Sequence, residues 1–250
     1  MPLTLRKPSG HDDTARGLGS RLALGGLTAG VVSVPFILLM LLVLSEWEPL
    51  ARLDRRVADA LYDNVRHEPA LVSVLDVGAV VTDPWVLRAV VLAVAVWLWR
   101  RGVRRLAAWA VTTAAIGGVL GVLLKLLVER SRPAFPEPVA TASGYSFPSG
   151  HALNSMLCAG ILLLVFLPVL RGARRVVAFA AAGALVLFTG YDRIALGVHY
   201  VSDVLAGWVV ALAVLTGTAG AFEIWRREHG RRPSQVSEGV EPEAARSMSE

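Results

Sequence analysis

Three short clusters of polar residues interrupt an otherwise apolar chain. They lie at residues 125–132, 148–151 and 193–203. Ionisable groups within or beside apolar segments of membrane-spanning length are costly, so each cluster is a candidate functional site. From these clusters, two histidines, one carboxylate and three basic side chains could surround one anion. This combination of residue types suits phosphoryl transfer without a metal ion.

The basic residues of these clusters are suited to binding a phosphoryl group. Lys125, Arg132 and Arg193 carry cationic N–H donors that match its oxygens. Lys125 and Arg132 are seven residues apart, so two helical turns place them on one face. Ser149 and Gly150 stand where a helix is expected to begin, and the free backbone N–H groups of such a helix start can hold an anion. These five residues are the predicted phosphate ligands.

The two histidines and one aspartate have the spacing of a catalytic group. His199 and Asp203 are four residues apart at an expected helix start, so they share one helix face. There the carboxylate can accept a hydrogen bond from one ring nitrogen and fix the tautomer, which leaves the other nitrogen as a nucleophile. His151 can act as the general acid that protonates the leaving oxygen. His199, Asp203 and His151 are therefore the predicted catalytic residues.

Each cluster also has a simpler explanation. The first alone could be basic residues that snorkel from a helix end, and the second alone could be an ordinary turn before a helix. His199 and Asp203 could form a structural hydrogen bond or, with His151, part of a zinc site. The neighbouring cations would repel a metal ion, so we expect no metal and no cofactor. Three clusters on one membrane face favour a single shared anion site.

Membrane helices must position these clusters. The chain has 250 residues, of which 54% are hydrophobic. The apolar residues gather in blocks of about 20, the length that crosses a bilayer, rather than following an amphipathic period. We therefore predict an all-α polytopic membrane protein with a six-transmembrane-helix core at residues 21–226. The predicted spans are Leu22–Ser45, Pro84–Trp99, Val103–Val128, Ala152–Leu170, Val176–Gly190 and Val201–Trp225.

Residues 50–82, between the first two spans, are predicted to form interfacial helices. Asp54–His67 carries spaced apolar residues among charges, which fits a helix that lies at the membrane surface. Leu71–Val81 is apolar but too short to span, and Asp76 interrupts it. A seventh span is not expected in this region.

The distribution of basic residues predicts the topology. Most of the 25 lysines and arginines fall in the two tails and in the loops at residues 100–105 and 171–175. The positive-inside rule assigns these segments to the cytoplasm, so both termini are cytoplasmic and the three clusters face outside. The tails, residues 1–20 and 227–250, are polar and predicted to be disordered. The net charge of +5 has the same origin, and without aromatic residues among the basic ones we expect no nucleic-acid partner.

The three clusters resemble the three signatures of the type 2 phosphatidic acid phosphatase superfamily. The spacing within each signature matches, and the resemblance covers about residues 103–223. The matching residues are Lys125, Arg132, Pro133, Pro148, Ser149, Gly150, His151, Arg193, His199 and Asp203. The resemblance implies a six-helix membrane core and phosphoryl transfer through a phosphohistidine.

The same resemblance implies a role for each residue. His199 would be the nucleophile, Asp203 its orienter and His151 the acid and base. The phosphate ligands would be Lys125, Arg132, Ser149, Gly150 and Arg193. The expected partners are membrane lipids and a lipid phosphate or diphosphate substrate. Candidate substrates are a prenyl diphosphate, phosphatidic acid and phosphatidylglycerol phosphate, and the outward site favours a cell-wall lipid carrier. The sequence leaves the choice of substrate and the oligomeric state open.

Two other functions fit the same residues. A transferase would pass the phosphoryl group or the headgroup to a lipid or sugar hydroxyl instead of water. Phosphate release without an acceptor would argue for hydrolysis. An anion transporter or a phosphate-lipid receptor would bind without turnover, and the presence of both histidines argues against it.

One position departs from the family pattern. Serine usually precedes the arginine of the third signature, and this chain has Asp192 there. An ionised carboxylate cannot donate a hydrogen bond to phosphate and would repel it if aimed inward. Asp192 can point away, pair with Arg193 or Lys125, or narrow the choice of substrate. We expect it to pair or point away, because the other ligands are all present.

We predict that Asp192→Ser retains or raises the rate of phosphate release from a lipid phosphate. The substitution removes a carboxylate and leaves the predicted ligands in place. Steady-state kinetics of the purified variant in detergent measure the effect. A loss of more than about tenfold, roughly 1.4 kcal/mol, would show that Asp192 has a positive role.

Overall fold

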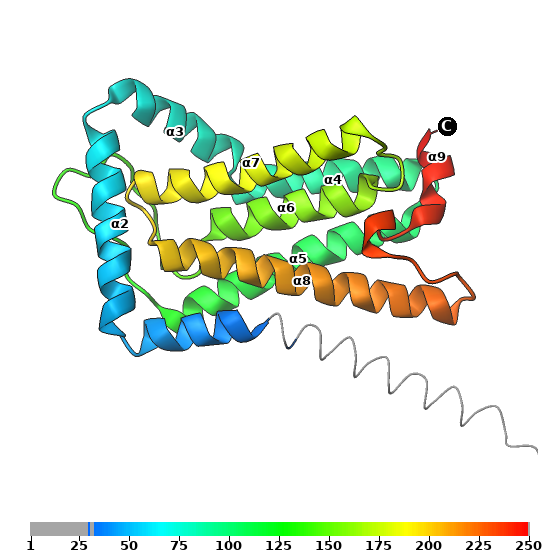
Figure 1. The fold of residues 1–250 in the computed structure, drawn as a ribbon, viewed down its shortest axis with the longest axis horizontal. Coiled ribbons are helices and arrows are strands. Elements are labelled where there is room, and N and C mark those ends of the chain that lie inside the picture. Colours follow the sequence, from blue (N-terminus) through cyan, green and yellow to red (C-terminus); the bar gives the residue numbers. More distant parts are fainter. Residues whose placement is uncertain (1–29, 31–32, 250) are drawn as a thin grey trace, which may run out of the picture.

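The computed structural model describes residue 30 and residues 33–249, and this part of the chain is helical without a strand. Figure 1 shows the arrangement. The helices are Ser33–Leu44, α2 (Glu48–Arg66), α3 (Pro69–Val81), α4 (Pro84–Arg100), α5 (Arg104–Val128), α6 (Gly150–Phe166), α7 (Ala173–Ala195), α8 (Val201–Glu228) and α9 (Ala245–Ser249), with 3-10 turns at Val236–Glu238 and Pro242–Ala244.

The long helices run side by side, and one helix crosses their end. Helices α4 to α8 lie lengthwise in Figure 1, with α6 packed among α4, α5, α7 and α8. Helix α2 stands across the end of this bundle, at 91° to the helix before it. The turn between α4 and α5 and the C-terminal segment lie at the opposite end.

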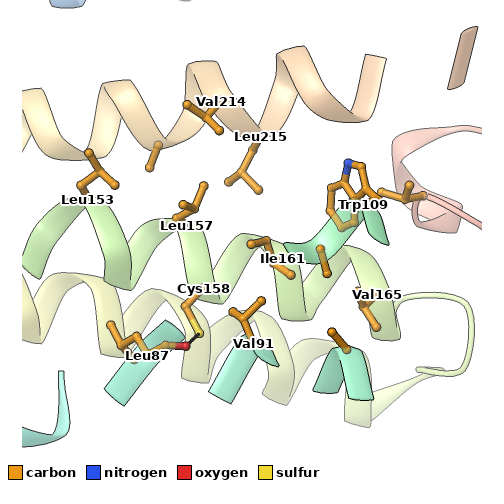
Figure 2. Packing of buried hydrophobic residues seen from close by; sticks show 14 of the residues in the cluster. Leu87, Val91, Trp109, Leu153, Leu157, Cys158, Ile161, Val165, Val214 and Leu215 are labelled. Carbon is orange, nitrogen blue, oxygen red and sulfur yellow. Dashed lines mark hydrogen bonds between the residues drawn. The ribbon is translucent and has the colours of Figure 1, made fainter. Parts of the chain in front are cut away.

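The core of the bundle is built around α6. Leu153 and Leu157 of α6 face α8, where Leu215 points back toward them, and Cys158 faces α4 (Figure 2). The Cys158 thiol lies 3.7 Å from the Leu87 carbonyl oxygen. In a membrane the outer faces meet lipid tails that are as apolar as leucine, so van der Waals packing holds such a bundle together.

The outward faces of the bundle are apolar, as a membrane protein requires. On α5, Val119, Val122, Leu126 and Leu127 are all more than half exposed. Helices α5, α7 and α8 are each long and apolar enough to cross a membrane. The helix Ser33–Leu44 with α2, and α3 with α4, qualify as bent pairs, so the described residues hold three to five spans by length and composition. The prediction of an all-helical polytopic membrane protein is confirmed.

Each of the six predicted spans corresponds to a helix, with shifted ends. Helix α6 begins at Gly150 and ends at Phe166, so it is shorter than the predicted span Ala152–Leu170 and falls below the length that defines a span on its own. Helix α7 extends to Ala195, five residues beyond its predicted end. Residues 22–29 and 31–32 of the first predicted span lie outside the described residues.

The region predicted to hold interfacial helices contains α2 and α3. The buried residues of α2 are Asp54, Ala58, Tyr62 and Val65. They recur every three or four positions, which is the period of one helix face. Charged residues cover the rest of the helix, so α2 presents one face to the bundle and another to the surroundings. A carboxylate, Asp54, stands within the buried stripe.

The C-terminal segment differs from its prediction. The composition of residues 227–250 predicts disorder, whereas the chain after α8 folds back onto the bundle and ends in α9. Val240, Ala244 and Met248 are buried in the main core. Arg226, itself buried, binds Glu243 and Glu223 at 2.6 Å each. The prediction of disorder was wrong because three apolar residues and one buried guanidinium hold an otherwise polar segment against the bundle. The tail at residues 1–20, also predicted to be disordered, lies outside the described residues.

Helices α6 and α8 approach closely at Gly207. A Cβ atom placed there would lie 2.8 Å from the Ser149 carbonyl oxygen and 3.0 Å from the Leu153 nitrogen. Both are backbone atoms, so they cannot move aside as a flexible side chain would. Small residues at such contacts let transmembrane helices pack backbone to backbone.

Gly207→Ala is therefore expected to destabilise the protein by about 1–3 kcal/mol through overpacking. Gly220→Ala is the matched control on the same helix, since a Cβ there meets no heavy atom of the described chain within 4 Å beyond its neighbours. Thermal melting in detergent measures both. We expect a lower melting temperature for Gly207→Ala only, and equal values for the two variants would contradict the close approach.

Candidate active site

The three polar clusters meet at one end of the bundle. There α5 ends, α6 begins, α7 ends and α8 begins, while α2 lies across them (Figure 1). The Ser149 backbone nitrogen donates to the Asp203 carbonyl oxygen at 2.9 Å, which ties the start of α6 to the first turn of α8. The Lys125 ammonium donates to the Tyr145 carbonyl oxygen at 2.6 Å, which ties α5 to the loop before α6. The shared face expected from the sequence is therefore present.

His199 is held between a carboxylate and a guanidinium. Its Nδ1 lies 3.3 Å from Asp203 Oδ2, and its Nε2 lies 3.1 Å from Arg132 Nη1. A guanidinium can only donate, so Nε2 must accept and carries no proton. The ring proton is then on Nδ1, facing the carboxylate. This assignment rests on the geometry of the donors and gives the tautomer that an attacking Nε2 requires.

The imidazole is also neutral. Only 2% of His199 is exposed, and burial lowers the pKa of His199 to about 4, although the hydrogen bond to Asp203 opposes the shift. The positive charges of Arg132 and Lys125 push the pKa in the same direction as burial. His199 therefore keeps its Nε2 lone pair at neutral pH.

The backbone around His199 is tight. The Arg193 carbonyl oxygen accepts from the Val198 and His199 nitrogens, both at 3.2 Å. The Tyr200 nitrogen donates to Asp203 Oδ2 at 2.9 Å at the start of α8. These bonds fix the short connection from α7 to α8 and leave His199 little freedom to leave its carboxylate.

The loop before α6 positions the basic side chains. Arg132 donates to the carbonyl oxygens of Gly144, Ser143 and Val198 at 3.0, 3.0 and 2.8 Å. Burial lowers the pKa of Arg132 from its usual value, and a guanidinium remains charged in proteins. The carbonyl contacts hold its plane beside the unprotonated nitrogen of His199, where negative oxygens would gather around a reacting phosphorus.

The start of α6 carries Ser149, Gly150 and His151. The Ser149 hydroxyl oxygen caps the helix by accepting from the Ala152 nitrogen at 3.4 Å. A Cβ at Gly150 would lie 4.0 Å from Lys125 Cε, so this helix start adjoins the basic cluster. The structure thus places Ser149 as a cap whose oxygen is engaged by the helix itself, beside the expected ligand Lys125.

His151 faces α3 and the other charged groups of the site. It lies close to the backbone of Ala79 and to the charges of Arg193 and His199. A zinc site would need His151 beside His199 and Asp203. Within the part of the chain that the structure describes, no three histidine, cysteine, aspartate or glutamate side chains are grouped to hold a metal ion.

Asp192 pairs with Arg193, one of the two expected arrangements. Arg193 Nε lies 2.7 Å from Asp192 Oδ2, and the carboxylate has no exposed surface. Asp192 Oδ1 is buried without a hydrogen-bond partner among the described residues. The pair partly neutralises Arg193, so this chain offers phosphate less positive charge than a serine at this position would leave.

Two residues that the sequence prediction missed complete the site. Arg130 lies between Lys125 and Arg132 and binds both Asp203 and Asp54 of α2, at 2.6 and 2.8 Å. A signal for Asp54 was present in the sequence, because it falls in register with the apolar residues of α2. Nothing in the sequence singled out Arg130, because it lies between two other basic residues, Lys125 and Arg132, that already matched the expected pattern.

Comparison with known proteins places the three clusters within one matched segment. The sequence profile of the PAP2 superfamily matches residues 106–227, which contain all three clusters. The matched segment, just under half of the chain, has the sequence pattern of the PAP2 superfamily. The predicted superfamily resemblance is thereby confirmed, while Asp54 and the whole of α2 and α3 lie outside the matched residues.

Curated relatives match part of the chain. Phosphatidylglycerophosphatase B of Bacillus subtilis is 37% identical over 112 residues, 44% of this chain and 54% of the relative. Decaprenylphosphoryl-5-phosphoribose phosphatase of Mycobacterium tuberculosis is 37% identical over 119 residues, 46% of this chain and 60% of the relative. Lipid A 1-phosphatase of Rhizobium etli is 33% identical over 109 residues, which are 40% of this chain and 43% of the relative. The chain spans about half the length of the curated relatives that it matches.

A solved structure has the same fold. The crystal structure of a transmembrane PAP2 type phosphatidylglycerolphosphate phosphatase from Bacillus subtilis superposes with a TM-score of 0.66. The superposition covers 78% of this chain and 97% of the other, at 24% sequence identity. At that identity the likeness establishes the arrangement of helices, and the chemistry rests on the residues themselves.

Proposed function

We propose that this protein hydrolyses the phosphate of a membrane lipid through a phosphohistidine at His199. One observation carries the proposal: the imidazole has Nδ1 against the Asp203 carboxylate and an unprotonated Nε2 beside Arg132. The proposed nucleophile thus contacts its orienting carboxylate through one ring nitrogen. Its other ring nitrogen lies beside a cation that can offset the developing negative charge. The curated relatives, all named as phosphatases, support the same reaction class.

In the first step, His199 Nε2 attacks phosphorus while the bond to the lipid oxygen breaks. His151 gives a proton to that oxygen, so the lipid leaves as an alcohol or, from a diphosphate, as a monophosphate. Arg132, Lys125 and Arg193 offset the negative charge on the phosphoryl oxygens. The ring becomes positively charged once Nε2 is bonded to phosphorus, and the adjacent Asp203 carboxylate stabilises that charge.

In the second step, water attacks the phosphorus of the phosphohistidine. His151, now neutral, takes the proton of the water, and the phosphorus–nitrogen bond breaks to release inorganic phosphate. His199 returns to its neutral form with the proton still on Nδ1. Dividing the reaction helps because uncatalysed hydrolysis of phosphate monoesters is among the slowest reactions known.

The position of the site supports a lipid substrate at the outer membrane face. The site lies at the bundle end, next to apolar outer faces that can meet an acyl or prenyl chain. Arg100, Arg101, Arg104 and Arg105 lie around the turn at the other end, which the positive-inside rule places in the cytoplasm together with both termini. Prenyl diphosphate, phosphatidic acid and phosphatidylglycerol phosphate are the candidates, and the names of the relatives favour a phosphate on a lipid or lipid-linked headgroup.

The proposal predicts phosphate release that survives EDTA and depends on His199. Purified protein in detergent is incubated with each of the three lipids, and inorganic phosphate is measured. His199→Ala is expected to abolish release, while His67→Ala, which changes an exposed histidine at the end of α2, leaves it unchanged. Release that EDTA abolishes, or that persists in His199→Ala, would contradict the mechanism.

The acid role of His151 predicts a dependence on the leaving group. His151→Ala should slow hydrolysis of a lipid phosphate, whose alkoxide leaves poorly, by about 10²- to 10⁴-fold. Hydrolysis of p-nitrophenyl phosphate, whose leaving group needs no proton, should fall much less in the first step. Pre-steady-state release of the alcohol or phenol measures the two effects. Equal losses on both substrates would count against proton donation by His151.

A further inference from the structure

A buried chain of charges runs from α2 to the nucleophile. Arg130 Nη2 lies 2.8 Å from Asp54 Oδ2, and Arg130 Nη1 lies 2.6 Å from Asp203 Oδ1. The second oxygen of Asp203 faces His199. Asp54 and Asp203 are 1% and 0% exposed. Each group in the chain Asp54–Arg130–Asp203–His199 is therefore held by its neighbours.

Asp54 also holds the first turn of α8. Its Oδ1 accepts from the Ser202 backbone nitrogen at 3.0 Å, and the Ser202 hydroxyl donates to its other oxygen. Arg130 Nη1 donates to the same hydroxyl oxygen at 2.7 Å. Free N–H groups at a helix start favour a negative charge. An anion from α2 thus fixes the turn that presents both His199 and Asp203.

Arg130 pairs with two buried carboxylates, those of Asp54 and Asp203. Asp54 and Asp203 would repel each other, and burying either without a cation would cost several kcal/mol. Burial alone would lower the pKa of Arg130, but the charges of Asp203 and Asp54 outweigh burial and raise it. The ionised Asp203 is then able to hold the Nδ1 proton of His199.

The geometry separates Arg130 from the phosphate ligands. Lys125 and Arg132 bind neutral carbonyl oxygens of the loop, which a phosphate can replace. Arg130 binds two carboxylates, and its guanidinium also lies over the Tyr200 ring at 4.4 Å. An ion pair that only attached α2 to the bundle would not need to contact a residue of the proposed catalytic group. Here the guanidinium holds the carboxylate that orients the nucleophile.

We propose that Arg130 and Asp54 are positioning residues for His199, acting through Asp203. Arg130 occupies one Asp203 oxygen and leaves the other for His199, while Asp54 fixes Arg130 and the first turn of α8. The inference rests on the proposed function, in which His199 attacks phosphorus. It also makes α2, which lies outside the residues matched by the superfamily profile, part of the catalytic apparatus.

The test compares kcat and KM of four variants on phosphatidylglycerol phosphate. Arg130→Ala is expected to lower kcat about 10- to 100-fold, as for loss of a charge-assisted hydrogen bond to a reacting group, with KM within about threefold. Arg130→Lys keeps the charge but can pair with one carboxylate only, so its kcat should lie between those of wild type and Arg130→Ala. Asp54→Asn should lower kcat, whereas Asp59→Asn, an exposed site on the same helix, should not.

Chemical rescue separates positioning from folding. Millimolar guanidinium should restore part of the kcat of Arg130→Ala, because it can occupy the space between the two carboxylates, and it should leave Asp59→Asn unaffected. A structural defect would not be restored by a denaturing ion. Unchanged kcat in Arg130→Ala, a rise in KM alone, or failure of guanidinium to rescue would overturn the inference.

Orthovanadate distinguishes failure of this inference from failure of the proposed hydrolysis. It forms a five-coordinate adduct with a nucleophile and mimics the phosphoryl transition state. Calorimetric titration should show about tenfold weaker binding to Arg130→Ala than to wild type and Asp59→Asn. If wild type binds vanadate but hydrolyses no lipid, only the hydrolysis proposal fails. If wild type and Arg130→Ala bind equally, the positioning role is wrong.

Discussion

The carboxylate of Asp203 has no exposed surface, yet it accepts hydrogen bonds from three directions. Arg130 binds one oxygen, and His199 and the Tyr200 nitrogen share the other. A buried charge persists only when it is paired and hydrogen-bonded on all sides. The arrangement of the whole end of the bundle follows from this requirement, since the partners come from the loop after α5, from the turn after α7 and, through Asp54, from α2.

The membrane makes that requirement stricter. Helices in lipid gain little from burying apolar surface against each other, so close backbone contacts and polar bonds decide their register. The α6–α8 contact at Gly207 and the bond from the Ser149 nitrogen to the Asp203 carbonyl supply both. These contacts bring the start of α6, which adjoins Lys125, next to His199 and Asp203. The fold thus assembles the site by the same contacts that align its helices.

Much of this arrangement can be predicted from the sequence, because the signals are local. The span segments are continuous apolar blocks, and the predicted contact of His199 with Asp203 is present, although His199 precedes Tyr200, the N-cap of α8. The prediction that Lys125 and Arg132 share a helix face is wrong, because α5 ends at Val128, Glu129 turns the chain into a left-handed conformation and Arg132 lies in the loop that follows. The contact of Asp54 with Arg130 could not be predicted in that way. The two residues are 76 positions apart and meet only because α2 turns across the bundle end.

The order of the C-terminal segment could not be predicted from its composition either. Its composition is that of a disordered tail, and its order depends on the pairing of Arg226 with Glu243 and on the burial of Val240. Such pairings are properties of the folded bundle. Asp192 is intermediate: its pairing with Arg193 was among the expected outcomes because the two residues are adjacent, while its buried, unpartnered Oδ1 became visible only in three dimensions.

The central claim is a covalent phosphoryl group on His199, and trapping it is the most direct test. Wild-type protein is mixed with a phosphate-labelled lipid substrate, quenched in alkali within the first turnover, digested and analysed by mass spectrometry. The account predicts an acid-labile, alkali-stable phosphoryl group on the peptide that contains His199. Turnover with no phosphoryl group on that peptide, or with the group on another residue, would contradict it.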